Sequence, residues 1–187
     1  MQHFRVKFFV QPDLRPDLGA AIPVFHRWIQ ESRLEEMLID VADYRHVPGG
    51  PGVLLVAHDA FYSLDQAEDR LGLLYTRRTE LEGSTQEKLR HAFAAAARAC
   101  AELEKEPEFA GHLVFSGAEC EFSVNDRLLA PNTEETWNLL RPELHALLDS
   151  VWGAGSYRLA RAGEARDVFR VSAQCETPAN LNLFLAG

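Results

Sequence analysis

The sequence predicts an α+β fold, in which a mainly antiparallel β-sheet carries its helices on one face. Several short segments alternate apolar and polar residues with a period of two, which is typical of strands with one buried face. Two longer segments repeat apolar residues at helical spacing behind capping residues. The expected order is strand, helix, three strands, helix, strand, helix and two strands. Helices on one face of an antiparallel sheet bury the apolar sides of both kinds of element.

The first strand and the first helix lie at the start of the sequence. Segment 3–11, HFRVKFFVQ, places every second residue on one side, as in a strand. These residues are Phe4, Val6, Phe8 and Val10. Segment 21–34, AIPVFHRWIQESRL, carries apolar residues close to helical spacing, and Pro23 is compatible with a first helical turn.

Three runs rich in valine, leucine and tyrosine predict strands two to four. They are MLIDVADYRHV (37–47), GVLLVAHDAFYSL (52–64) and LGLLYTRR (71–78). Pro48-Gly49 and Pro51-Gly52 each supply the two residues that a type II turn requires, so the first two runs form a hairpin. With its turn centred near Gly50, the numbers of paired residues sum to about 100.

Segment 84–105 predicts a long helix, which opens with a Ser84 and Glu87 capping box and is stopped by Pro107. Segment 112–126, HLVFSGAECEFSVND, alternates again and predicts a strand with one buried and one solvated face. Its solvated face carries Glu119, Glu121 and Ser123.

The remaining sequence predicts a helix and two short strands. Asn132 and Glu135 form a second capping box, and Pro142 is expected to kink or split the helix that follows. SYRLAR (156–161) and DVFRVSAQC (167–175) predict the closing strands, and NLNLFL (180–185) would add an edge segment.

This order of elements permits two architectures within a single domain spanning residues 1–187. One is a ferredoxin-like plait with additions. The other consists of two strand–helix–hairpin half-units, about 1–82 and 110–187, joined by helix 84–105. The second is similar in element order to bacterial gyrase-inhibitor-like small-molecule sensors, a resemblance of topology that implies no function. The halves share no residue-by-residue identity, so a duplication rests on topology alone.

Composition narrows the partners. The chain has 28 acidic and 19 basic side chains and a formal net charge of -9, which repels phosphate backbones and anionic lipids. We therefore expect no nucleic-acid partner. No apolar run approaches the roughly 18 to 20 residues of a membrane span, and no signal-peptide pattern is seen, so a cytoplasmic protein is expected. The three cysteines are far apart and are expected to pack as small apolar residues.

Segment 43–59, DYRHVPGGPGVLLVAHD, places two histidines and two aspartates around a turn rich in proline and glycine. In the hairpin register above, His46 faces Leu54 and His58 faces Ala42, which separates the two imidazoles by roughly 13 Å along the strands. A single metal ion needs ligand atoms at about 2 Å, so we predict no metal at this hairpin and no cofactor.

The same register places Asp40 diagonal to His58, and a shift by one residue places Asp43 opposite it instead. A carboxylate beside an imidazole raises its pKa or fixes its tautomer, which suits a general base. His58, Asp40 and Asp43 are therefore the candidate catalytic residues. The alternative is that an aspartate only satisfies a buried histidine.

Four further residues are candidates for binding a ligand. Tyr44 and His46 belong to the same hairpin. Asn125 and Arg127 precede the capped helix, whose backbone N–H groups could hold an anion. The alternative is that the second pair only shapes the turn.

Three hypotheses for function follow. The first is a small-ligand-binding or self-associating module, because no catalytic motif is present and pockets form between packed elements of such folds. The second is a hydrolase or isomerase that uses the histidine and carboxylate pair. The third is a structural homodimer component, in which exposed strand edges pair between copies.

Overall fold

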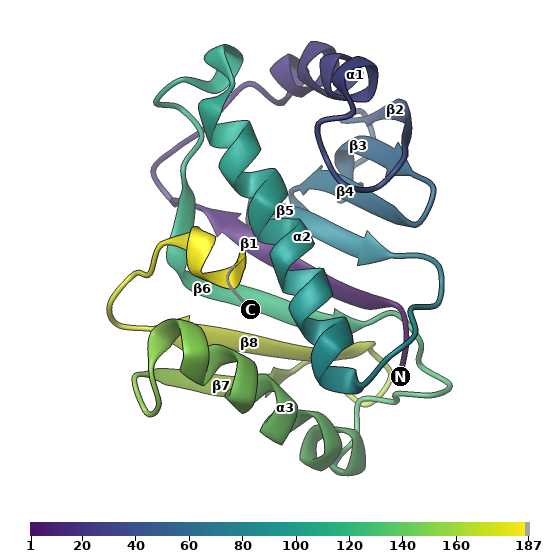
Figure 1. Ribbon diagram of the computed structural model, residues 1–187, viewed down its shortest axis with the longest axis vertical. Coiled ribbons are helices and arrows are strands. Elements are labelled where there is room, and N and C mark those ends of the chain that lie inside the picture. The colour runs from purple at the N-terminus through teal and green to yellow at the C-terminus, as the bar shows by residue number, and fades with distance from the viewer. Residues whose placement is uncertain (186–187) are drawn as a thin grey trace.

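The computed structural model describes residues 1–185, which form one open antiparallel sheet with the α-helices on one face (Figure 1). The strands are β1 (Phe4–Val10), β2 (Leu38–Tyr44), β3 (Gly52–Ala57), β4 (Ala60–Asp65), β5 (Gly72–Arg77), β6 (Phe115–Val124), β7 (Tyr157–Ala162) and β8 (Phe169–Cys175). The α-helices are α1 (Ala21–Glu31), α2 (Thr85–Lys105) and α3 (Glu134–Trp152). Short 3-10 helices are η1 (Leu18–Ala20), η2 (Ala67–Asp69), η3 (Pro107–Phe109) and η4 (Leu181–Leu185). The predicted α+β class is confirmed.

The spatial order of the strands is β2-β3-β4-β5-β1-β6-β8-β7, so the first strand of the chain lies in the middle of the sheet. Beside β1 lie β5 and β4, and beside β6 lie β8 and β7, in the same relative order. A ferredoxin-like plait is not confirmed by this order. That the two halves are related units stays a prediction.

The core lies between the sheet and the helices. Alternate residues of β1 point toward α2, as the period of two predicts, and Phe4, Val6 and Phe8 are buried there. Phe93 of α2 stacks on Phe122 of β6, with ring centroids 6.4 Å apart. This aromatic layer fixes α2 diagonally across the centre of the sheet (Figure 1).

The capping box predicted at the start of α2 is confirmed, and the one predicted at the start of α3 is wrong. Ser84 and Glu87 form the predicted reciprocal capping box. The predicted box of Asn132 with Glu135 is wrong, because Thr133 is the N-cap residue. Asn132 is instead buried, and its amide donates to the carbonyls of Ala162 and Glu164. Helix α3 continues through Pro142 without being split.

Two strand predictions are corrected by the structure. Run 52–64 is not one strand but the hairpin of β3 and β4, and His58 and Asp59 form its turn. The Asp59 carbonyl accepts the N–H of Arg78 at 2.8 Å, which ties this turn to the end of β5. NLNLFL is not an edge strand, because η4 packs Phe184 against Phe8 and Phe93 in the core.

The register predicted for the first hairpin is also wrong. Leu54 lies opposite Ala42, and Val56 lies opposite Asp40, so paired residues meet closer to the start of the chain than expected. The reason is that both prolines and all three glycines lie in or next to a long loop that runs from the end of β2 to the start of β3. A bulge between Leu38 and Asp40 shifts the register once more.

Candidate functional site

The structure separates the predicted catalytic residues. His58 lies in the exposed turn after β3, and its Nδ1 is 3.1 Å from the carboxylate of the adjacent Asp59. Asp40 is exposed on β2, where its side chain accepts the N–H of Val41. Asp43 pairs with Arg45 at 2.8 Å, and the hydrogen bonds from Arg45 lower the pKa of Asp43 to about 2. A catalytic role for these residues stays an untested prediction.

The predicted ligand-binding residues are also dispersed. Tyr44 and His46 are exposed at the end of β2 and in the loop that follows it. His46 and His58 therefore lie beyond opposite ends of β3. The backbone of Asn125 bonds to His3, and the Arg127 guanidinium donates to the Arg166 carbonyl at 3.1 Å. Their roles in binding stay predictions.

A cluster of polar side chains lies instead between β4, β5 and α2, on the helix-bearing face. We call Glu36, Tyr62, Tyr75 and His91 the Glu36 cluster. Tyr62 and Tyr75 are opposite each other on β4 and β5, so both rings point to the same side, 5.2 Å apart in an edge-to-face arrangement. Glu36 comes from the loop between α1 and β2, and His91 comes from α2.

Glu36 is the centre of this cluster. Its side chain is 8% exposed. One carboxylate oxygen accepts a hydrogen bond of 2.5 Å from the Tyr62 hydroxyl, and the Tyr75 hydroxyl is 3.5 Å from the other. The Tyr75 hydroxyl also lies 3.3 Å from Nε2 of His91, whose ring is one-third exposed. A chain of polar contacts therefore leads from the buried carboxylate toward solvent.

The surroundings set the protonation states of the cluster. Burial raises the pKa of Tyr62 and of Tyr75, and the neighbouring Glu36 raises both further. Burial lowers the pKa of His91 below its ordinary value. Both phenols therefore remain protonated donors, and the imidazole is neutral near pH 7.

Glu36 has no lysine or arginine within ion-pair distance among residues 1–185, and its nearest basic atom is Nε2 of His91 at 3.9 Å. A hollow of about 30 Å³ adjoins the carboxylate. Its lining is Leu34, Glu35, Glu36, Tyr62, His91, Ala94, Ala95 and Arg98. Arg98 of α2 pairs with Glu35 at the rim. The space is close to the volume of one water molecule or one ammonium group.

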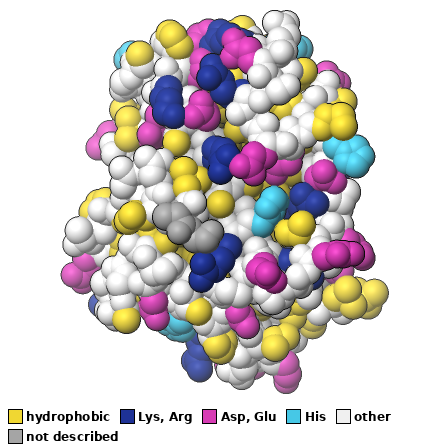
Figure 2. Space-filling model, in the orientation of Figure 1, with side chains coloured by type: hydrophobic (Ala, Val, Ile, Leu, Met, Phe, Trp, Pro, Cys, Tyr) yellow, Lys and Arg dark blue, Asp and Glu magenta, His cyan; other side chains and the backbone are white. Residues whose placement is uncertain are grey.

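The surface around the cluster mixes side chains of several kinds. Figure 2 shows the helix-bearing face, on which apolar, acidic and basic side chains are interspersed, and a histidine is visible near its centre. At the hollow itself, Ala94 and Ala95 lie beside the charged pair of Glu35 and Arg98, a combination that suits an amphipathic ligand.

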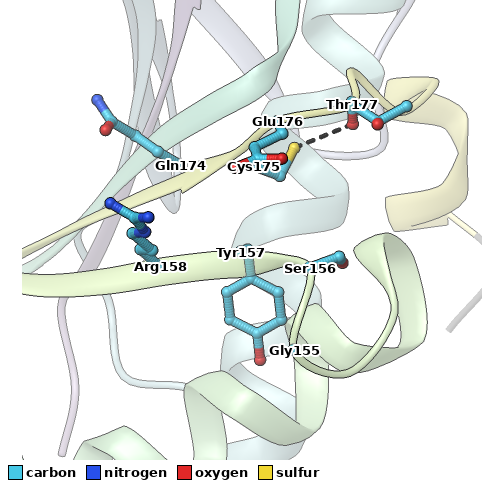
Figure 3. A pocket seen from close by; sticks show the side chains of 8 residues that line it. All are labelled: Gly155, Ser156, Tyr157, Arg158, Gln174, Cys175, Glu176 and Thr177. Atoms are coloured by element: carbon cyan, nitrogen blue, oxygen red, sulfur yellow. Dashed lines mark hydrogen bonds between the residues drawn. The ribbon is translucent and has the colours of Figure 1, made fainter.

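A larger groove of about 430 Å³ lies at the hairpin of β7 and β8, and its tyrosine and cysteine side chains are engaged in local contacts (Figure 3). Tyr157 points to the opposite side of β7 from Arg158, and its hydroxyl donates to Asp149 of α3 at 2.7 Å. The Cys175 sulfur lies 3.1 Å from the Thr177 carbonyl, and burial raises the pKa of this thiol. A protonated thiol is a poor nucleophile.

No group of three or more metal-ligating side chains gathers within the described part of the chain. None of its helices has the length and apolar character of a membrane span. We found no protein-family model that matches the sequence, and no curated protein with significant similarity to it. The fold and the Glu36 cluster thus define an α+β domain with a buried acidic site, and functional inference rests on this geometry.

Sequence reasoning missed the cluster because its members lie on four separate segments. Glu36 belongs to a loop without periodicity. His91 alone lies in a sequence pattern that could have indicated a site, because it shares one helical line with Ala95 and Arg98 beside the buried stripe of α2. A histidine at the edge of such a stripe faces a neighbouring element.

Proposed function

We propose that the protein is a small-molecule-binding module that binds an organic cation, with a primary ammonium group at Glu36. The observation that carries the proposal is a buried carboxylate that receives phenol hydrogen bonds but no lysine or arginine partner within residues 1–185. Buried charges in proteins are normally paired, because their desolvation is costly. A ligand ammonium would complete the pair.

Three further features support a cation. The net charge of -9 attracts positive ligands over a distance. The two tyrosine rings add negative electrostatic potential beside the carboxylate. The hollow of about 30 Å³ limits the buried part to a small head group, so the rest of the ligand lies on the rim near Ala94 and Ala95. A primary ammonium should therefore bind better than a trimethylammonium.

The experiment is a calorimetric titration with n-hexylammonium, with n-hexanol as the neutral match. We expect saturable binding of the ammonium alone, and a loss of affinity of about tenfold or more in Glu36→Gln, because a charge-assisted pair is removed. Glu31→Gln is the matched control, since Glu31 is an exposed glutamate of α1 that pairs with Arg33 and lies outside the lining of the hollow. Equal affinities of wild type and Glu36→Gln, or equal binding of the alcohol, would contradict the proposal.

A second candidate function is acid–base catalysis, and the contact chain Glu36–Tyr75–His91 favours it. In this proposal a hydrolase or isomerase would use His91 and Glu36 in place of the predicted His58, Asp40 and Asp43. Mass spectrometry after long incubation with an amino-acid alkylamide, which joins an ammonium group to a hydrolysable bond, separates the two functions. Binding alone leaves the ligand unchanged, whereas catalysis yields a product that His91→Gln abolishes while ligand affinity persists.

A cytoplasmic location is part of this proposal. It is supported by the free thiols of Cys100, Cys120 and Cys175, because disulfides form in oxidising compartments and reduced cysteines are usual in the cytosol.

A further inference from the structure

The opposite face of the sheet carries charged side chains that are buried although no α-helix of residues 1–185 covers them. Lys7 of β1 is 4% exposed and Asp65 of β4 is 6% exposed. They form an ion pair of 2.5 Å, and the Lys7 ammonium also donates to the Arg70 carbonyl at 2.7 Å. Burying a charged pair is costly, so an arrangement of this kind requires a specific reason.

The cover is the segment between β4 and β5, residues 66–71, which we call the strap. Its Arg70 side chain lies over β1, with the guanidinium 3.7 Å from the ring centroid of Phe9. Glu68 of the strap pairs with Arg170 of β8 at 2.6 Å. Through the side chains of Arg70 and Glu68, the strap therefore contacts residues of β1 and β8.

The strap is held in an unfavourable backbone conformation. Glu68 has a φ angle of 58° and Asp69 a φ angle of 56°, in the left-handed region that side chains rarely adopt. Strain of this kind persists only where surrounding contacts enforce it, and it gathers at functional sites. The contacts with Lys7 and Arg170 enforce it here.

Beneath the strap lies a cavity of about 210 Å³, which we call the open-face cavity. Arg5, Lys7 and Arg170 line it together with Asp65, Glu121 and Ser123. Asp65 forms an ion pair with Lys7. Glu68 forms an ion pair with Arg170, whose guanidinium also lies 3.7 Å from Glu121. The volume is several times that of a water molecule and accommodates a small organic ion.

Arg5 is the group that this network leaves unmatched. No carboxylate lies within ion-pair distance of its guanidinium among the described residues, and its Nε is buried without a hydrogen-bond partner. Burial lowers the pKa of Arg5, and the nearby carboxylates of Asp65 and Glu121 offset this effect only in part.

We propose that the open-face cavity is a second binding site, which takes a small oxyanion, a carboxylate or a phosphate, on Arg5. The planar guanidinium presents parallel N–H donors that match two oxygens of such a group, and the anion supplies the acceptor that Nε lacks. Lys7 and Arg170 also line the cavity, each paired with a carboxylate, so Arg5 is its lining cation without a partner among the described residues. This site lies across the sheet from the Glu36 cluster and does not depend on it.

The test is calorimetric titration at low ionic strength with inorganic phosphate and, separately, with malonate. We expect saturable binding of at least one, and the tighter arm identifies the oxyanion class. Arg5→Gln should weaken binding by about tenfold or more, because a charge-assisted contact is lost. Arg166→Gln, at a side chain that is 82% exposed, removes the same charge and is expected to retain binding.

Thermal denaturation of Arg5→Gln shows whether the variant folds, and Arg5→Lys provides a second variant that keeps the charge but lacks Nε. Weakened binding in both, with folded proteins, supports the proposal. Absence of saturable binding to either anion in wild type, or unchanged affinity in Arg5→Gln, overturns it. Glu36→Gln should leave anion affinity unchanged, so failure of the ammonium site is distinguishable from failure of this one.

Discussion

The Tyr62 hydroxyl donates a hydrogen bond of 2.5 Å to Glu36, and both groups are withdrawn from solvent on the helix-bearing face. Removing this donor leaves a buried carboxylate oxygen unsatisfied. We expect Tyr62→Phe to lower the free energy of unfolding by about 1–3 kcal/mol in urea denaturation. Tyr44→Phe, at an exposed tyrosine of β2, should change it by less than about 0.5 kcal/mol. Similar losses in both variants would contradict a special contribution of this bond.

Acid should destabilise the protein through His91. Its pKa in the folded state lies below the ordinary 6.5, because it is partly buried. As the pH falls below that value, the unfolded chain binds a proton before the folded one does, so stability is lost. Urea denaturation between pH 7 and pH 5 should show a smaller loss in His91→Gln than in wild type. The matched control is His112→Gln at an exposed histidine, which leaves the His91 contribution in place.

The buried pair of Lys7 and Asp65 gives a third expectation. Lys7→Met leaves Asp65 buried without its cation and should lower the free energy of unfolding by about 3–5 kcal/mol. The double variant Lys7→Met, Asp65→Leu should recover most of that loss, because neither charge remains. Arg166→Met, which breaks the exposed pair with Glu164, should cost less than about 1 kcal/mol. A double variant as unstable as Lys7→Met would disprove this account.

The backbone strain in the strap leads to a fourth prediction. Glycine adopts a φ angle of 56° without steric cost, so Asp69→Gly relieves the strain at this position. This relief partly offsets the destabilisation that results from the greater conformational freedom of glycine in the unfolded chain. Asp13→Gly is the control, because Asp13 is exposed and outside the left-handed region. We expect Asp69→Gly to be more stable than Asp13→Gly by about 1 kcal/mol in thermal or urea denaturation. Equal stabilities would show that the strap is unstrained.

Local signals accounted for much of the fold. The period of two in β1 and the capping box of Ser84 and Glu87 are written in neighbouring residues, and both elements were placed correctly. The turn at His58 was missed, because a histidine and an aspartate between two apolar runs are a weaker break than glycine or proline. The position of η4 depends on contacts with Phe8 and Phe93, which lie far away in the sequence.

The candidate sites could not be predicted from local sequence patterns, because their residues also lie far apart in the sequence. Glu36 and Tyr62 meet only after α1 and the β2–β3–β4 meander have been placed, and Arg5 and Arg170 meet across the full width of three strands. The predicted pair of His58 with Asp40 relied on a register, and a long loop and a bulge changed it. Contacts between residues that are close in the sequence can therefore be predicted more reliably than sites whose residues meet only in the tertiary structure.

The central position of β1 bears on how quickly the chain folds. Val6 pairs with Tyr75 on one side and with Phe122 on the other, so the middle of the sheet cannot form until distant parts of the chain have met. Closing such long loops precedes any gain from the contacts they bring, which slows the rate-limiting step. Refolding on the timescale of milliseconds to seconds, typical of topologies with non-local pairing, is the kinetic consequence of this arrangement.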